Sequence, residues 1–146
     1  MAGLASPKYR HRLPQLEDRR FLTDGGLETT LIYHEGWDLP IFEAFSLLES
    51  ERGRAALRAY YDRYLPLAIK RGMGFVLESP TWRANPDWAA KLGYGLEALA
   101  KLNHAAIDLM REVRDAYETK DTSIVISGCI GPIVLIKWAV DRRSSA

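Results

Sequence analysis

Apolar residues along the chain fall into short continuous runs that are separated by stretches with helical spacing. Runs at 21–22, 75–77 and 124–126 each lead into glycine, proline or polar residues, which is typical of buried strands. Between these runs, apolar positions recur three and four residues apart, and this spacing predicts amphipathic helices. The order strand, helix, strand, helix, strand favours an α/β fold with parallel strands and right-handed crossovers.

The first long helix is predicted to begin after Ser50, whose hydroxyl suits an N-cap, and to end at Gly72. A short buried helical segment is expected before it, at 41–48. Pro66 lies inside the helical pattern and predicts a kink or a break. The tyrosines of this predicted helix could form a ligand-stacking surface, but packing in the core is the favoured interpretation. The residues predicted to be buried are Leu57, Tyr60, Tyr61, Tyr64, Leu65 and Ala68.

Two further helices are predicted between the second and third strands. Asn85 and Pro86 suit an N-cap and a first helical position, and Gly93 suits the end of a short helix. A longer helix follows from Leu96. Its predicted buried stripe comprises Leu99, Leu102, Ala106, Leu109, Met110, Val113 and Tyr117.

Composition indicates one soluble globular domain, because 47% of the 146 residues are hydrophobic and 27% are charged. The net charge of +1 gives no bulk attraction to nucleic acid or to an anionic membrane. A single cysteine, Cys129, excludes an internal disulfide framework and is consistent with a reducing, cytoplasmic compartment. No apolar run reaches the ~20 residues of a membrane span.

Three segments are expected. Residues 1–20 are predicted to be a flexible basic leader, because they combine two prolines and five Arg/Lys with few apolar residues. They also lack the continuous apolar region of a secretory signal. Residues 21–132 carry the strand and helix pattern. Residues 133–146 begin as an apolar stretch and end in a polar one, and they are interpreted as a divergent tail, with a closing strand or helix over the open edge as the alternative.

Acidic and hydroxyl side chains follow two of the predicted strands. Asp24-Gly25-Gly26 follows the first strand, where it forms either a simple turn or a ligand loop. Glu78, Ser79 and Thr81 follow the second strand. Ligands bind at the carboxyl edge of parallel sheets and barrels. The glycines at 72 and 74 precede a strand instead of opening a helix, which excludes a dinucleotide fingerprint.

Three segments together resemble the N-terminal half of the homocysteine S-methyltransferase family. They are FLTDGGLETT at 21–30, GFVLESPTWRANPDWAAKLGY at 74–94 and ISGCIGP at 126–132. The resemblance runs in order from about residue 20 to 132. It implies a zinc-dependent (β/α)₈ TIM-type barrel that transfers a methyl group to the thiol of homocysteine, a step of methionine biosynthesis. The methyl donor would be a methylated amino acid, betaine or folate.

The resemblance also implies which residues hold the substrate. Asp24 and Gly25 would contact homocysteine, and Gly26 would allow its close approach. Thr81, with Glu78 and Ser79, would line the same mouth from the second strand. Since a whole barrel needs ~250 residues, the chain would supply a partial barrel of about three strand-helix units and is expected to be truncated.

The zinc ligands of the family are three cysteines in the later half of the fold. Cys129 follows the third strand and matches none of them, and no Cys-Cys pair is present. It is therefore interpreted as a small buried thiol, and the chain is expected to hold no zinc.

Two other functions stay open at this point. The chain could be a non-catalytic half-barrel module that self-associates, or pairs with a complementary fragment, through exposed strand edges. It could also form a small flavodoxin-like sheet with an unrelated ligand.

Overall fold

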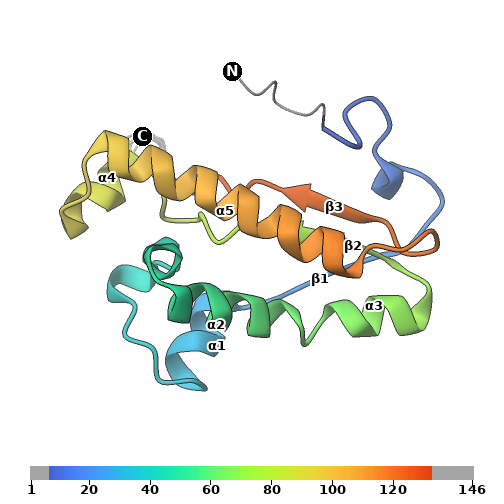
Figure 1. Ribbon diagram of the computed structural model, residues 1–146, viewed down its shortest axis with the longest axis horizontal. Coiled ribbons are helices and arrows are strands. Elements are labelled where there is room, and N and C mark those ends of the chain that lie inside the picture. The colour runs from blue at the N-terminus through green and yellow to red at the C-terminus, as the bar shows by residue number, and fades with distance from the viewer. Residues whose placement is uncertain (1–6, 133–146) are drawn as a thin grey trace, which may run out of the picture.

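The computed structural model describes residues 7–132 of the chain. The predicted tail at 133–146 and the first six residues of the predicted leader lie outside the described residues. Three parallel strands form one sheet in the order β1-β2-β3 (Figure 1). The strands are β1 (Phe21–Thr23), β2 (Gly74–Glu78) and β3 (Ile124–Ser127).

The sheet register places the carboxyl ends of the strands together. Leu22 of β1 lies opposite Phe75 of β2, and Glu78 at the end of β2 lies opposite Ser127 at the end of β3. The predicted parallel arrangement is confirmed. Loops that follow the three strands therefore leave from one edge of the sheet.

Within the described residues, five α-helices and four short 3₁₀ helices connect and flank the strands. The α-helices are α1 (Leu27–Tyr33), α2 (Glu51–Tyr61), α3 (Leu65–Arg71), α4 (Pro86–Ala89) and α5 (Leu96–Tyr117). The 3₁₀ helices are Pro14–Leu16, Pro40–Phe42, Phe45–Glu49 and Ala90–Leu92.

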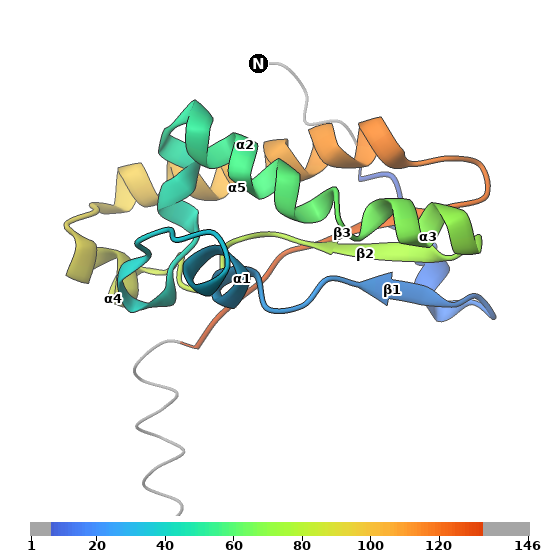
Figure 2. The same ribbon diagram turned by 90° about the horizontal axis from the view of Figure 1, so that it is seen from below.

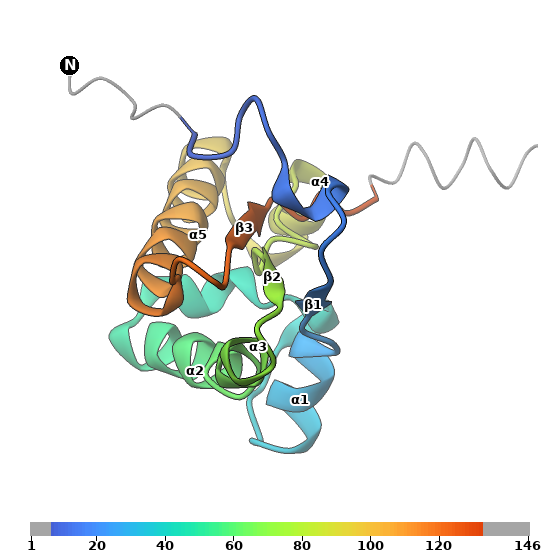
Figure 3. The ribbon, with the colours of Figure 1, turned by 90° about the vertical axis from the view of Figure 1, so that its right-hand side faces the viewer.

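Helices α2, α3 and α5 lie on one side of the sheet (Figures 2 and 3). The core lies between these helices and the strands, where apolar side chains are buried away from solvent. Its largest fully buried side chains are Tyr60, Tyr61, Phe45, Phe75, Leu31, Leu48, Leu57, Leu65, Leu77, Leu109, Met110 and Ile124.

The predicted helix boundaries are confirmed where a cap or a proline marks them. The Ser50 hydroxyl accepts a hydrogen bond from the Gly53 amide at 3.0 Å, and the Asn85 side chain accepts one from the Trp88 amide at 3.4 Å. The break expected at Pro66 separates α2 from α3, with the proline in the first turn of α3. Gly93 ends the segment that begins with α4, in the left-handed conformation.

Helix α1 was not predicted from the sequence. It has seven residues and no side-chain cap, and three β-branched residues, Thr29, Thr30 and Ile32, lower its helix propensity. Its buried face consists of Leu27 and Leu31 alone. Two apolar positions one turn apart are too few to predict a helix from the sequence. The packing of Leu27 and Leu31 against the rest of the fold therefore determines this helix.

Gly53 allows α2 to pack directly on the preceding 3₁₀ helix, Phe45–Glu49. A Cβ atom at this position would lie 2.1 Å from the Leu47 carbonyl oxygen and 2.7 Å from its carbonyl carbon. Backbone atoms cannot rotate away as a side chain can. Only glycine therefore fits this contact without a shift of one helix against the other.

We expect Gly53→Ala to lower the free energy of unfolding by roughly 1–3 kcal/mol, because overpacking outweighs the better helix propensity of alanine. Gly128→Ala is the control, since a Cβ there meets nothing within 4 Å. Urea denaturation of both variants measures the difference. Equal stability of the two variants would contradict this account of the α2 contact.

Candidate functional site

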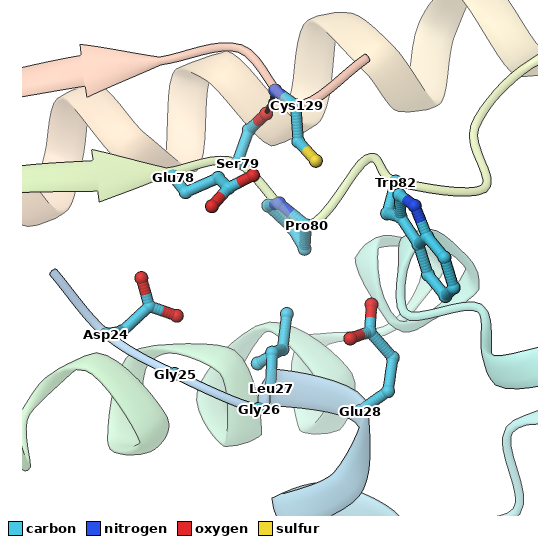
Figure 4. Close-up of a pocket in the computed structure, with 10 residues that line it drawn as sticks. All are labelled: Asp24, Gly25, Gly26, Leu27, Glu28, Glu78, Ser79, Pro80, Trp82 and Cys129. Carbon is cyan, nitrogen blue, oxygen red and sulfur yellow. Dashed lines mark hydrogen bonds between the residues drawn. The ribbon is translucent and has the colours of Figure 1, made fainter. Parts of the chain in front are cut away.

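The carboxyl edge of the sheet opens onto a cavity of about 200 Å³. The loops after β1, β2 and β3 meet there (Figure 4), as parallel pairing requires. The cavity is lined by Asp24, Gly25, Gly26, Leu27, Glu28, Glu78, Ser79, Pro80, Trp82 and Cys129.

Five of the six predicted substrate-binding residues lie in this lining. They are Asp24, Gly25, Gly26, Glu78 and Ser79. The sixth, Thr81, is buried at 7% exposure and is not part of the lining. The structure therefore brings the two predicted loops together, while the role of their residues in substrate binding stays a prediction.

The cavity is acidic. Its lining contains the carboxylates of Asp24, Glu28 and Glu78 and no basic side chain. Asp24 and Glu78 point toward one another from the ends of β1 and β2, and Glu28 points toward Trp82 (Figure 4). A protonated amine is the ligand group that such a lining favours.

Burial raises the pKa of Asp24 and of Glu28 above their ordinary values. For Asp24, the hydrogen bond from Tyr60 opposes this rise, and the nearby charge of Glu78 adds to it. For Glu28, the charges of Asp24 and Glu78 add to the rise and that of Arg83 opposes it. A cationic ligand would relieve this repulsion among the carboxylates.

Tyrosine hydroxyls from α2 and the turn after it hold the loops that carry these acids. The Tyr60 hydroxyl lies 2.9 Å from Asp24 Oδ2 and 2.9 Å from the Gly25 carbonyl oxygen. Tyr61 donates to the Glu78 carbonyl oxygen at 2.8 Å, and Tyr64 donates to the Gly25 carbonyl oxygen at 3.1 Å. The predicted core packing is correct for Tyr60 and Tyr61, which are fully buried, but their hydroxyls also position the site.

Gly26 turns the chain from β1 into α1. Its φ of 67° lies in the left-handed region, which strains residues with a Cβ atom. Its carbonyl oxygen accepts the first helical hydrogen bond, from the Thr30 amide at 2.8 Å. The turn places Glu28 on the first turn of α1, where it faces the cavity.

A closed ring of hydrogen bonds joins the loop after β2 to the loop after β3. The Cys129 amide donates to Ser79 Oγ at 3.0 Å, and the Thr81 hydroxyl donates to the Cys129 carbonyl oxygen at 2.8 Å. Since the Thr81 proton is used there, the Ser79 hydroxyl donates to Thr81 Oγ1, at 2.8 Å. Ser79 and Thr81 therefore fix the cavity wall through their hydroxyls.

Cys129 is half-buried and lines the cavity. Burial, the hydrogen bond to Glu78 and the surrounding carboxylates raise the pKa of its thiol to about 12, so the thiol is protonated at neutral pH. Zinc binds the thiolate form. No group of three or more His, Cys, Asp or Glu side chains in residues 7–132 is arranged to hold a metal ion. The described residues do not fit the thiolate zinc site that the family resemblance implies.

Glu28 and Trp82 line the cavity but were not among the predicted site residues. Glu28 could have been predicted as a site residue if α1 had been predicted, because the first turn of a helix after Gly26 places this side chain near the end of β1. Trp82 follows Thr81 directly and is 37% exposed. Its position in the loop that follows the second strand is the signal in the sequence that would have found it.

The profile of the homocysteine S-methyltransferase family matches residues 21–137. The chain belongs to this family. A search of curated proteins gives no significant match.

Among solved structures, the fold is similar to the metallated form of the homocysteine methyltransferase MmuM from Escherichia coli, with a TM-score of 0.60. The similarity covers 84% of this chain but 41% of that chain, at 18% sequence identity. The three parallel strands and their helices therefore form an open sheet that matches part of a TIM barrel, as predicted. Identity this low supports the fold alone.

Across residues 7–132, no helix is both long enough and apolar enough to span a bilayer.

We expect Tyr60→Phe to lower the free energy of unfolding by about 1.5–3 kcal/mol, because it removes a buried hydrogen bond to a carboxylate. It should also raise the pKa of Asp24 further, because the Tyr60 hydroxyl lowers it. Urea denaturation and NMR titration of the side-chain carboxyl measure the two effects.

Tyr64→Phe is the matched control for Tyr60→Phe. It removes a more exposed hydrogen bond to the same loop and should cost about 1 kcal/mol or less. Equal losses in the two variants, or a lower pKa for Asp24 in Tyr60→Phe, would show that the hydroxyl does not support Asp24.

Proposed function

We propose that this chain carries the homocysteine-binding part of a homocysteine S-methyltransferase. The observation that supports this most is that Asp24 and Glu78, which follow or end adjacent strands, line one cavity together with Glu28, and that this lining contains no basic side chain. The cavity of about 200 Å³ suits one small amino acid.

In this proposal, the acidic lining holds the ammonium group of homocysteine. Asp24 is the principal acceptor, because Tyr60 fixes its carboxylate and because its burial strengthens attraction to a cation. The Gly25 and Gly26 backbone leaves room for the ligand to approach, since the lining there has no side chain. Ser79 and Thr81 keep the opposite wall in place through the hydrogen-bond ring.

Methyl transfer also requires that the substrate thiol lose its proton, because the thiolate is the nucleophile. None of the described residues is assigned the role of deprotonating this thiol. Cys129 is protonated at neutral pH, and the chain has no second cysteine to help form a thiolate-rich zinc site. Binding of the amino acid, and not turnover, is therefore the activity proposed for this chain alone, in keeping with its span of 41% of the solved relative.

A second candidate is the non-catalytic interaction module. Among the described residues, β1 and β3 each have a strand partner on one side only. An unpaired strand edge is a template for pairing with another chain. This observation supports association, but it does not account for the acidic cavity.

The first test is calorimetric titration of the chain with homocysteine and with γ-mercaptobutyric acid, which lacks the ammonium group. We expect Asp24→Asn to weaken homocysteine binding roughly 10- to 100-fold, the equivalent of one charge-assisted hydrogen bond. Asparagine keeps the shape and can still accept from Tyr60. The desamino analogue should bind weakly and equally to both proteins.

Two results would contradict this proposal. One is absence of homocysteine binding by the wild-type chain. The other is an Asp24→Asn variant that loses affinity for the desamino analogue as much as for homocysteine, because the carboxylate would then not be acting on the ammonium.

Homocysteine affinity should depend on pH through Asp24 and Glu28. Their folded pKa values are raised, so the carboxylates are ionised above those values and lose their charge as the pH falls through them. Because the ammonium of homocysteine stays protonated over this range, affinity should decline as the pH falls through these raised values, which is at a higher pH than the ordinary Asp value of 3.8 would give. Calorimetry over the acidic range measures this, and affinity that rises on acidification would contradict it.

A further inference from the structure

Two tryptophans hold the side chain of Arg83. Its guanidinium carbon Cζ lies 4.2 Å from the ring centroid of Trp82 and 3.7 Å from the ring centroid of Trp88. A guanidinium at this distance is attracted to an indole ring by the negative charge of the ring face. Two such contacts restrict the guanidinium to a narrow range of positions.

Trp88 is fixed by contacts of its own. Its amide donates to the Asn85 side chain at the start of α4, and its indole N–H donates to the Pro132 carbonyl oxygen at 3.2 Å. The same ring contacts a second cation, because Lys91 Nζ lies 3.9 Å from its centroid. The ring that holds Arg83 is therefore supported both by α4 and by the loop after β3.

Arg83 lies beside the acidic cavity without lining it. Trp82 belongs to the lining, whereas Arg83 does not, and the Glu28 carboxylate points toward the Trp82 indole (Figure 4). Burial is the main cause that raises the pKa of Glu28, and the charge of Arg83 opposes this rise. Asp24 and Glu78 are the other charged groups that act on Glu28. The guanidinium is therefore close enough to influence this carboxylate.

Arg83 and Glu28 nevertheless stay apart. Among the ion pairs of residues 7–132, none joins these two side chains. The Nε atom of Arg83 is buried and has no hydrogen-bond partner in the same residues, although a carboxylate could accept from a guanidinium through two parallel bonds. Since a buried donor without a partner is costly, the stacking contacts hold the guanidinium against this cost.

We propose that Trp82 and Trp88 are positioning residues that hold Arg83 away from Glu28 and so keep the cavity acidic for a cationic ligand group. An ion pair between Arg83 and Glu28 would neutralise one of the three carboxylates of the lining. It would also compete with the ligand for that carboxylate. Here the cation is the ammonium of homocysteine, an identity that rests on the proposed function.

The test removes the aromatic face of Trp88 and follows the Glu28 carboxyl by NMR titration without ligand. Trp88→Leu keeps an apolar side chain on α4 but offers no ring to the guanidinium. Trp88→Phe is the matched control, because it keeps a ring and loses the indole N–H that bonds to Pro132. Lys91→Met, which removes the other cation from the same ring, is the surface control. Calorimetry with homocysteine then measures the affinity of each variant.

We expect the pKa of Glu28 to fall in Trp88→Leu, because the released guanidinium pairs with the carboxylate. Homocysteine affinity at neutral pH should fall roughly tenfold, the equivalent of one charge-assisted hydrogen bond. Adding Arg83→Gln to Trp88→Leu should restore the affinity and return the pKa to the wild-type value or above it. Trp88→Phe and Lys91→Met should match the wild type. Arg83→Gln alone should raise the pKa of Glu28, because it removes the opposing charge.

Two results of the titration would overturn the proposal. One is a wild-type pKa for Glu28 in Trp88→Leu, with the amide of Leu77 in the central strand still protected from hydrogen exchange, which shows that the fold is retained. The other is a lowered pKa that persists after Arg83→Gln is added, because Arg83 would then not be its cause. Should Trp88→Leu not fold, Arg83→Gln alone decides, and an unchanged pKa of Glu28 in that variant counts against the proposal.

The titration needs no ligand, so its result does not depend on the proposed function. If the wild-type chain binds no homocysteine but Glu28 responds as expected, the ligand assignment is wrong and the separation of Arg83 from Glu28 stands. If homocysteine binds with unchanged affinity to Trp88→Leu although the pKa of Glu28 has fallen, the stacking does not control ligand binding and the proposal is wrong.

Discussion

Parallel pairing of β2 with both of its neighbours is the constraint on which the rest of the structure depends. Because the strands are parallel, all three end at the same edge of the sheet. Asp24, Glu78 and Cys129 therefore line one cavity although they are far apart in sequence. The same pairing leaves β1 and β3 with one partner each among the described residues. The acidic cavity and the unpaired edges are therefore two consequences of one topology.

Hydroxyl groups turn this topology into a defined site. Tyr60 joins the core to the loop after β1, and the ring through Ser79 and Thr81 joins the loops after β2 and β3. Each hydroxyl satisfies a backbone or carboxylate group that would be costly to bury alone. Carboxylates held in this way are ready for a cation before it binds, which reduces the ordering that binding requires.

Features that depend on local chemistry could be predicted from the sequence. The caps at Ser50 and Asn85 and the break at Pro66 follow from neighbouring residues, and the family segments identified the fold. Contacts between distant segments could not be predicted in the same way. Helix α1 depends on packing of Leu27 and Leu31, Glu28 enters the cavity through that helix, and the bond between Tyr9 and Glu118 joins residues 109 positions apart.

The central claim is that the loops after β1 and β2 form a cradle for the ammonium of homocysteine. Amide NMR of the chain during addition of homocysteine tests it most directly, because it locates the ligand without requiring turnover. We predict concentration-dependent shifts at Asp24–Glu28 and at Glu78–Ser79, with Gly53 and the end of α5 unaffected. Shifts confined to the groove between residues 7–13 and α5, or no shifts at saturating ligand, would contradict the claim.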